Sequence, residues 1–518
     1  MNMRKISVFC GSVLAWGVVV VSGFTSCDDS MSFTTDRGAL LSFSTDTVRF
    51  DTVISTVGSS TRQLMVYNRN ADGLRIASVR LKQAYATPFR VNVDGSYLEP
   101  ESGARAYDFE VRTGDSIRVF AEVTMPENGQ DAPVALNDTL IFALESGVEQ
   151  HVILTAVGQD AYMWRGKVIE ADTLLEAGRP IVVYDSLSVR EGVTLSMAAG
   201  VQLYFHDGAN LWVHGRIVAE GTVDRPVVFR GDRTDRMFDY LPYDNTPSRW
   251  GGIRLKATST DNRLNHVDIH SASYGIACDS SSTDVMKLTL ENSVIHNVGG
   301  EGLGLYHCRA SVGNTQISNT LGHCVAVVGG WAEFVHCTLA QFYPWDAARG
   351  DALYLANKWL ALDYPLQHAH FLNCLVTGYA DDVVTGNLED ENKDVDYYFG
   401  NCVLRTVEAE DDAVRFVGVV YEKKGEEGTG QEQFRLFDTD NYLYDFRLKD
   451  ISVSRGMLKG LEKRKFNLEA KLQKIAYSIE QRTDDVVDFR MRLCCLKASR
   501  LFTMRLPKKV VPSFSVGS

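Results

Sequence analysis

An asparagine or histidine followed three residues later by an aliphatic residue recurs through the second half of the chain. Asn292, Asn314 and His336 are spaced 22 residues apart and precede Ile295, Ile317 and Leu339. Looser copies are His266/Ile269, Asn373/Val376 and Asn401/Leu404. A fixed period of about 20–50 residues is typical of solenoids and propellers. A propeller needs units of roughly 40–50 residues, so the repeat predicts a solenoid.

Short apolar segments separated by glycines begin near Leu187, and bends that tight favour glycine. A second apolar segment follows each Asn or His element: 275–277, 302–305, 324–327, 352–355 and 413–416. We expect these to stack as a second sheet. With the repeat, this pattern resembles a right-handed parallel β-helix of the pectate-lyase-like superfamily, and we assign it to residues 165–455.

The repeat element itself predicts which side chains point inward. Alternation within 335–339 places Val335, Cys337 and Leu339 on the inner face. Asn at a bend tolerates left-handed backbone angles and can stack on the next coil. Cys337, Cys374 and Cys402 each follow the repeat residue. The sequence favours a column of small buried side chains there, with disulfides between neighbouring coils as the alternative.

Residues 1–26 have a basic start, an apolar stretch shorter than a membrane span, and small residues before Cys27, which predicts a signal peptide. The segment Phe24–Cys27 resembles a lipobox, and the following Asp28 and Asp29 resemble lipoproteins of Bacteroidota. The resemblance implies lipidation of Cys27 and an outer-membrane protein, surface-exposed or on the periplasmic face. The alternatives are a secreted protein in which Cys27 is incidental and, less favoured, a transmembrane helix.

Alternating segments separated by turns predict a β-sandwich over residues 46–160, after a linker at 27–45. The expected strands are 47–54, 63–67, 74–81, 116–123, 139–143 and 151–156. The run 55–68 resembles immunoglobulin-like domains of the ASPM/SPD-2/hydin type. The fold class is therefore all-β. From Arg455 onward there are 15 Lys and Arg against 6 Asp and Glu, so residues 456–518 form a basic tail, either a helical cap or a segment whose reading frame has shifted.

A formal net charge of -13 argues against a nucleic-acid partner, because phosphate contacts need clustered cations. No catalytic motif is recognisable, and no cofactor is predicted. Asp268 and Glu291 occupy comparable repeat positions, but an acidic β-helix offers many such pairs. Enzymatic activity, as a polysaccharide lyase or glycoside hydrolase, therefore stays an alternative.

Three insertions interrupt the coils, at 232–249, 340–365 and 386–395, and insertions commonly carry function. The second contains aromatic and charged residues that suit sugar rings, although the rings could instead cover the coil. The candidate ligand-binding residues there and just after it are Trp345, Asp346, Arg349, Asp351, Trp359, His368 and His370. His368 and His370 could share a strand face, but no third ligand stands out, so no metal site is predicted. We expect a β-helix that binds a glycan or an envelope protein, or that is a structural envelope component.

Overall fold

The computed structural model describes residues 32–238, 240–359, 362–388, 395–409, 412–450, 452 and 454. The predicted signal peptide, Cys27 and the basic tail lie outside these residues. The chain forms two compact units, a sandwich unit (up to Phe50, Gly58–Met125, Ala135–Ala156) and a helix unit (Asp51–Val57, Pro126–Val134 and from Val157). Among the described residues, no helix is long and apolar enough to cross a bilayer.

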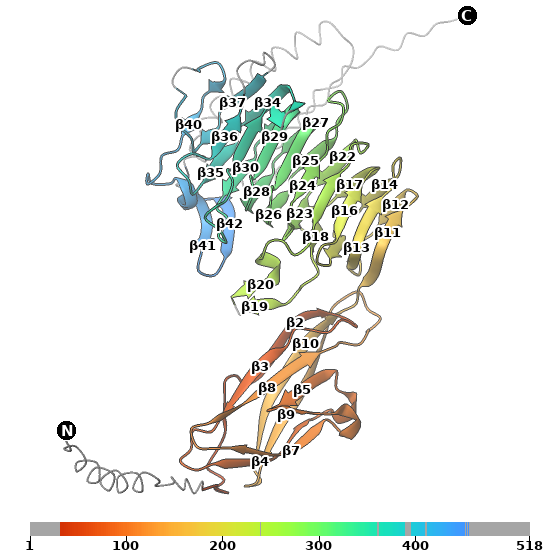
Figure 1. Cartoon of the computed structure of the whole chain (residues 1–518), viewed down its shortest axis with the longest axis vertical. Helices are drawn as coiled ribbons and strands as arrows, with labels where there is room; N and C mark the ends of the chain where they lie inside the picture. The colour runs from red at the N-terminus through yellow and green to blue at the C-terminus, as the bar shows by residue number, and fades with distance from the viewer. Residues whose placement is uncertain are drawn as a thin grey trace, which may run out of the picture. The chain divides into compact units, whose positions relative to one another are not determined.

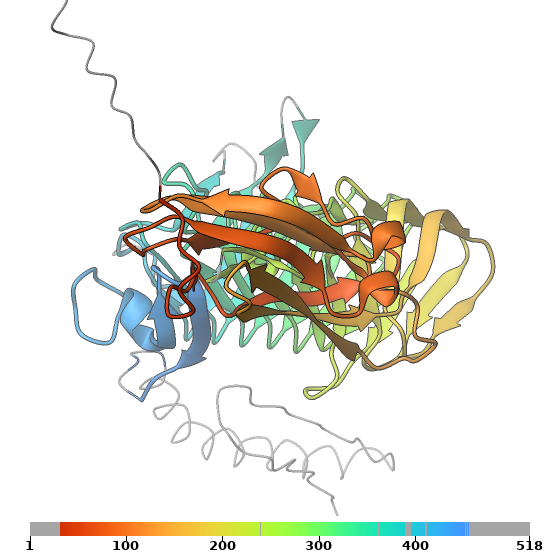
Figure 2. The ribbon, with the colours of Figure 1, turned by 90° about the horizontal axis from the view of Figure 1, so that it is seen from below.

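The sandwich unit consists of two five-stranded sheets, visible in red and orange in Figure 2. The first sheet has the order β1 (Ser42–Phe43), β3 (Arg62–Tyr67), β8 (Ser116–Val123), β5 (Phe89–Val93), β6 (Ser96–Tyr97). The second has the order β2 (Thr47–Ile54), β10 (Glu149–Gln159), β9 (Val134–Leu144), β4 (Leu74–Leu81), β7 (Arg105–Val111). Short 3₁₀ turns, η1 (Ala84–Ala86) and η2 (Pro100–Ser102), join some of these strands.

The core of the sandwich follows from alternation along its strands. In β8 every second residue is buried, which places Ile117, Val119 and Ala121 in the core. Strand β7 was not predicted. Buried and exposed residues alternate only at its end, and Asp108 interrupts the extended backbone with a positive φ of 60°. Strand β1 lies within the predicted linker and pairs with β3.

The helix unit is a parallel β-helix whose strands pair from coil to coil in three parallel sheets (Figure 1). Sheet one contains β12 (Thr173–Leu175), β14 (Thr194–Met197), β17 (Arg216–Glu220), β22 (Asn262–Asn265), β25 (Leu288–Glu291), the second halves of β27 (Leu303–Gly313) and β29 (Val325–Val335), β34 (Leu366–Leu372), β37 (Val395–Gly400) and β39 (Phe416–Val417).

Sheet two contains the first halves of β11 (Tyr162–Ile169) and β13 (Ile181–Val189), β15 (Gln202–Phe205), β18 (Val227–Gly231), β23 (Val267–His270), β26 (Val294–Val298), β28 (Gln316–Thr320), β30 (Thr338–Gln341), β35 (Leu375–Gly378), β38 (Val403–Leu404) and β40 (Val420–Tyr421). Sheet three contains the second halves of β11 and β13, β16 (Asn210–Val213), β21 (Gly252–Leu255), β24 (Ile276–Cys278), the first halves of β27 and β29, β31 (Leu353–Ala356) and β36 (Val384–Asn387).

The repeat residues stand at the bend between sheets one and two. His266, Asn292, Asn314, His336, Asn373 and Asn401 all have φ between 50° and 57°. Asn292 donates a hydrogen bond to Asn265 Oδ1 at 2.8 Å, and Asn314 donates to Asn292 Oδ1, which forms the expected stack between coils. A second left-handed column at the end of sheet two, with Asn297 and Asn319, was not predicted.

The interior of the β-helix is filled by stacked side chains. Phe334, Phe371, Phe399 and Phe416 stack with ring centroids 4.8–5.2 Å apart. Cys337, Cys374 and Cys402 are buried as free thiols, as the preferred interpretation predicted. The inward assignment of Val335 was wrong. The left-handed bend at His336 resets the alternation, so Phe334 points inward and Val335 is half-buried.

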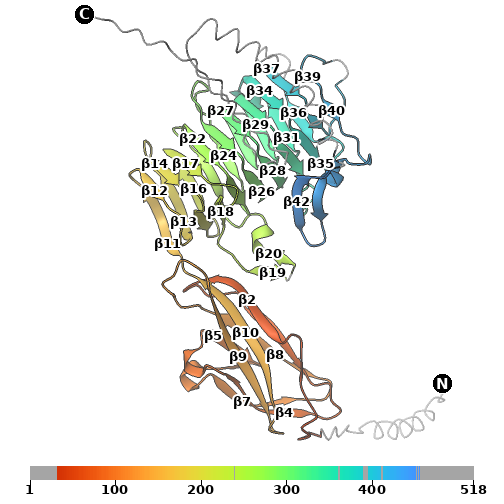
Figure 3. The ribbon, with the colours of Figure 1, turned by 180° about the vertical axis from the view of Figure 1, so that it is seen from behind.

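Within the described part of the chain, three hairpins extend from the coils. The first insertion contains β19 (Arg236–Phe238), β20 (Leu241–Pro242) and η3 (Tyr243–Asn245), and after β31 come β32 (Lys358–Trp359) and β33 (Leu362–Asp363). The last, β41 (Phe434–Asp438) with β42 (Leu443–Leu448), follows η4 (Gly430–Gln433) and is visible in blue in Figure 3. The predicted insertion at 340–365 is wrong as one block, because β31 within it belongs to sheet three. The apolar segment at 413–416 also departs from the prediction, since β39 pairs in sheet one.

Candidate functional site

A cleft of about 470 Å³ lies on the outer face of sheet two. Its floor is formed by His296 of β26, Gln316 and Ser318 of β28, and the bend residues Asn297 and Asn319. Asn245 of η3 and the β41–β42 hairpin also line the cleft, and Asn245 donates a hydrogen bond to the carbonyl of Tyr442 in the hairpin turn. The volume lies in the range of small-ligand pockets, about 300–1,000 Å³.

The hairpin is held on sheet two by a small apolar core of its own. Phe434 and Phe446 pack on Ala340, Leu375 and Val403, which come from three successive strands of that sheet. Alternation on β30, β35 and β38 places these apolar side chains on the outer face, where the hairpin covers them. The cleft therefore has a fixed wall.

Asn319 and Tyr444 line the cleft, and each has a buried polar side-chain atom without a hydrogen-bond partner among the described residues. These atoms are Oδ1 of Asn319 and the hydroxyl of Tyr444. Burial, followed by the charges of nearby Tyr and Asp side chains, raises the pKa of Tyr444, so its hydroxyl keeps its proton. Unpaired buried polar atoms each cost about 1–3 kcal/mol, and a ligand can supply the missing partners.

A row of four aromatic rings ties the cleft wall to two other segments. Trp345 stacks on Tyr442 at 4.3 Å, Tyr442 lies 6.3 Å from Tyr240, and Tyr240 lies 5.7 Å from Phe238, all with interplanar angles of 8–12°. The row joins the loop after β30, the turn of the β41–β42 hairpin and the first insertion. Trp345 therefore supports the wall of the cleft.

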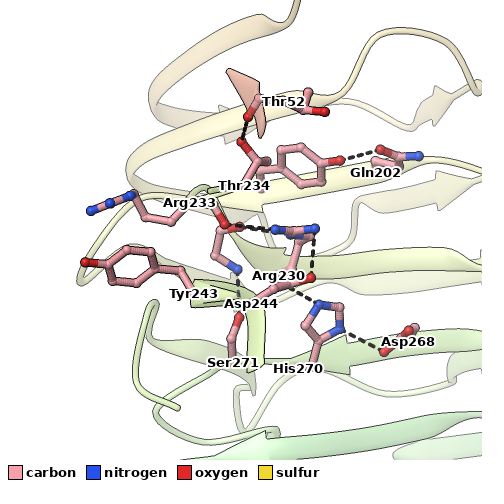
Figure 4. A network of polar contacts seen from close by, with 12 residues as sticks. Thr52, Gln202, Arg230, Arg233, Thr234, Tyr243, Asp244, Asp268, His270 and Ser271 are labelled. Carbon is pink, nitrogen blue, oxygen red and sulfur yellow. Dashed lines mark hydrogen bonds and ion pairs between the residues drawn. The ribbon is translucent and has the colours of Figure 1, made fainter. Parts of the chain in front are cut away.

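A charged network on the same face of sheet two shares His296 with the cleft. Figure 4 shows Arg230, Asp244, Asp268 and His270 of this network. His270 lies between two carboxylates, with Nδ1 2.9 Å from Asp268 Oδ1 and Nε2 2.8 Å from Asp244 Oδ1. Arg230 contacts Asp244 Oδ2 at 2.9 Å, and His296 Nε2 lies 3.3 Å from Asp268. The pairing of Phe229 with Ile269 and of His270 with His296 aligns these side chains across three coils.

The network fixes the protonation of its members. Burial by itself would lower the pKa of His270, but Asp244 and Asp268 outweigh it and raise the pKa to about 10. Burial favours the neutral form of Asp268, yet His270 and His296 hold its pKa well below the usual range. Burial would also raise the pKa of Asp244, but His270 and Arg230 outweigh it and lower that pKa. The imidazolium and both carboxylates are therefore charged at neutral pH.

Sequence reasoning did not identify this network as a site. Asp268 was recognised only as a position comparable with Glu291, and Glu291 is in sheet one. The usable signal was a polar residue at the outward position of consecutive coils, as in Arg230, His270, His296 and Ser318. Asp244 carries no such signal, because an insertion brings it there.

The structure distributes the seven predicted ligand-binding residues over several faces. Only Trp345 is beside the cleft; Asp346 accepts a hydrogen bond from Ala348 within its own loop. Arg349 donates to the carbonyl of Tyr343 and lies 4.6 Å from the Tyr379 ring. Asp351 pairs with Thr385 and, through its backbone N–H, with His323.

The remaining three lie farther along the coils. Trp359 is on the β32–β33 hairpin, edge-on to Tyr306 at 5.4 Å. His368 and His370 are on the outer face of sheet one, with Asp396 of β37. Burial, then His370, lowers the pKa of His368.

Comparisons with known proteins do not identify a family for the chain. A family model described as "Probable helicase domain" matches residues 426–495. This match covers less than half of the chain and lies mostly beyond the described residues. No curated protein sequence matches the chain.

Solved structures with partial likeness to the chain include two glycoside hydrolases and one ASH/PapD-like domain. The catalytic domain of a GH87 alpha-1,3-glucanase in complex with nigerose is 10% identical over 71% of this chain and 92% of that one, with a TM-score of 0.17. The ASH/PapD-like domain of human CEP192 is 13% identical over 25% and 90%, with a TM-score of 0.16. A family 123 glycoside hydrolase from Clostridium perfringens is 5% identical over 23% of this chain and 26% of that one, with a TM-score of 0.16. Scores this low do not determine function.

Proposed function

We propose that the cleft on sheet two binds a glycan, and that the protein is a carbohydrate-binding lipoprotein of the cell envelope. The carrying observation is that two residues lining one cleft, Asn319 and Tyr444, each have a buried polar atom without a hydrogen-bond partner among the described residues. A sugar offers hydroxyl groups that both donate and accept hydrogen bonds, so one ring can satisfy an amide oxygen and a phenol together. Gln316 on the floor is half-buried and adds a further polar partner.

Binding is favoured over hydrolysis by the charge state of the adjacent network. A glycoside hydrolase needs one carboxylic acid that stays protonated until it gives its proton to the leaving group. The pKa values of Asp244 and Asp268 are both lowered, so neither carboxyl is set as an acid. A lyase or hydrolase is the less supported alternative.

The test uses Tyr444→Phe, which removes the hydroxyl and keeps the ring. Purified protein is incubated with acidic and neutral polysaccharides, and both retention and released sugars are measured. We expect retention of at least one glycan without release, and about 3–10-fold weaker retention by Tyr444→Phe, the effect of one hydrogen bond. Because the hydroxyl is unpartnered, this variant should be at least as stable as the wild type.

Tyr354→Phe is the matched control, since Tyr354 is on β31 of sheet three. Its retention should equal that of the wild type. Unchanged retention by Tyr444→Phe would contradict the placement of the site, and release of sugars by the wild type would favour the enzyme. No retention and no release on any glycan would favour a structural envelope component.

The envelope address rests on the sequence around Cys27, which lies outside the described residues. Cys27→Ser removes the thiol that would be lipidated, and several acyl chains are needed for firm anchoring. We expect the wild type in the outer-membrane fraction and Cys27→Ser in the soluble fraction of the envelope. Equal fractionation of the two forms would contradict the lipid anchor while leaving the cleft proposal intact.

A further inference from the structure

The outer face of sheet one carries a polar cluster that the glycan cleft does not use. His368 and His370 project from β34, and Asp396 projects from β37 in the next coil. Nε2 of His370 lies 3.1 Å from both carboxylate oxygens of Asp396, and Nδ1 of His368 lies 3.6 Å from Asp396 Oδ2. One donor atom from each residue lies within 4.8 Å of the other two.

Local irregularity in the sheet brings the two imidazoles together. Residues two apart on a strand share a face. The pairing of β34 with β37 also shifts register between Leu366 and Ala369, and such irregularities re-aim side chains. As a result the ring centroids of His368 and His370 are 3.5 Å apart.

Neighbouring aromatic rings orient both imidazoles. Trp331 stacks on His368 at 4.5 Å with an interplanar angle of 5°, and Tyr398 lies 5.4 Å from His370. Nε2 of His368 is buried and has no hydrogen-bond partner among the described residues, so Nδ1 is the nitrogen that faces Asp396. The donor atoms of the three residues are therefore gathered within 4.8 Å of one another before any ligand binds.

Two of the three separations lie close to those of a tetrahedral metal site. Zinc binds imidazole nitrogen and carboxylate oxygen at about 2.0–2.2 Å, so two ligand atoms at a tetrahedral angle are about 3.3–3.5 Å apart. The separations of 3.1 Å and 3.6 Å to Asp396 lie on either side of that range. Two imidazoles and one carboxylate suit borderline divalent ions such as Zn²⁺ better than Ca²⁺ or Mg²⁺, which prefer oxygen ligands.

We propose that His368, His370 and Asp396 form a binding site for a divalent transition-metal ion of the zinc class. Three protein ligands leave a fourth position for water or for a ligand group, as in open zinc sites. The Asp396 side chain is 53% exposed, so that position is reached from solvent.

A second cluster in the same chain provides a matched control. Donor atoms of Asp268, His270 and His296 also lie within 4.8 Å of one another. There, however, both ring nitrogens of His270 are taken by Asp268 and Asp244, and Arg230 adds a positive charge. A protonated imidazole has no lone pair for a metal. The two clusters have the same residue types but differ in the imidazole nitrogens that are available to bind a metal.

The experiment titrates the untagged, metal-stripped full chain with Zn²⁺ by calorimetry, and with Co²⁺ by visible absorption, which reports tetrahedral coordination. The variants are His370→Gln and Asp396→Asn, with His296→Gln as control. We expect one strong Zn²⁺ site per chain, at least tenfold weaker binding in each of the first two variants, and unchanged binding in His296→Gln. Circular dichroism checks folding; the two variants come from different strands, so each can decide the question alone.

Absence of Zn²⁺ binding by the wild type would overturn the proposal. So would binding that survives either His370→Gln or Asp396→Asn, or binding that is lost in His296→Gln. None of these outcomes depends on glycan retention, so this proposal and the proposed function fail separately.

Discussion

Asn292, Asn314 and Asn401 each have a φ of 52–53° where the chain passes from sheet one to sheet two. Most L-residues lose about 1–2 kcal/mol in this conformation, whereas Asn tolerates it. Its amide also bonds the residue one coil away, as in the Asn314–Asn292 pair. The repeat therefore encodes a backbone angle together with a contact between coils.

Asn314→Ala should destabilise the β-helix by about 1–2 kcal/mol through backbone strain, in addition to the lost hydrogen bond. Asn314→Gly loses the same bond without that strain, so it should destabilise less. Urea unfolding followed by tryptophan fluorescence measures both. Equal effects of the two substitutions would show that the angle contributes nothing.

His270 predicts a pH dependence at the same scale. Folding raises its pKa from about 6.5 to about 10. The charged His270 therefore contributes fully to folding stability below pH 6.5, and this contribution is lost as the pH rises toward 10. The stability difference between the wild type and His270→Gln should therefore shrink between pH 6 and pH 10, measured by urea unfolding at each pH. A difference that stays constant or grows would refute the charged imidazolium.

At the scale of elements, the β-helix is stabilised because identical side chains of neighbouring coils stack on one another. Phe371 is fully buried between Phe334 and Phe399, and the same position in successive coils carries the same side chain. Each short strand buries little apolar surface by itself. Neighbouring coils complete the apolar column, which is why repeat proteins depend on nearest-neighbour contacts.

Phe371→Ala should lower the free energy of unfolding by about 3–5 kcal/mol, because it removes a buried ring and leaves a cavity in a column that cannot close. Tyr398→Ala, on the outer face of β37, should have a much smaller effect. Chemical unfolding of the two variants compares them. Comparable losses would argue against an inward phenylalanine column.

At the scale of the molecule, each unit has its own buried core. All the tryptophans except Trp16 of the predicted signal peptide lie between Trp164 and Trp359, within the helix unit. Tryptophan fluorescence therefore reports the β-helix alone, whereas calorimetry reports both units.

Phe142 is fully buried in β9 of the sandwich unit and contacts Phe43 at 5.1 Å. Phe142→Ala should lower the stability of the sandwich by about 3–5 kcal/mol and leave the fluorescence midpoint unchanged. Calorimetry and fluorescence on the same samples test this. A matching shift of the fluorescence midpoint would show that the two units unfold together.

Much of the architecture could be predicted from local patterns. Strands at 47–54, 74–81 and 116–123 were located because alternation depends only on neighbouring residues. The candidate site could not be located in this way. Asp244 reaches His270 from an insertion, and Tyr444 reaches the cleft from a hairpin more than a hundred residues after Asn319.

The sequence by itself determined the parallel β-helix, the left-handed bends between sheets one and two, and the buried cysteine column, because a period of 22 residues repeats the same local requirements in each coil. Only the tertiary structure decided which outward-facing side chains meet. It placed Asp396 beside His368 and His370, and a hairpin over sheet two, because such contacts depend on coil register and on insertions that do not follow the repeat.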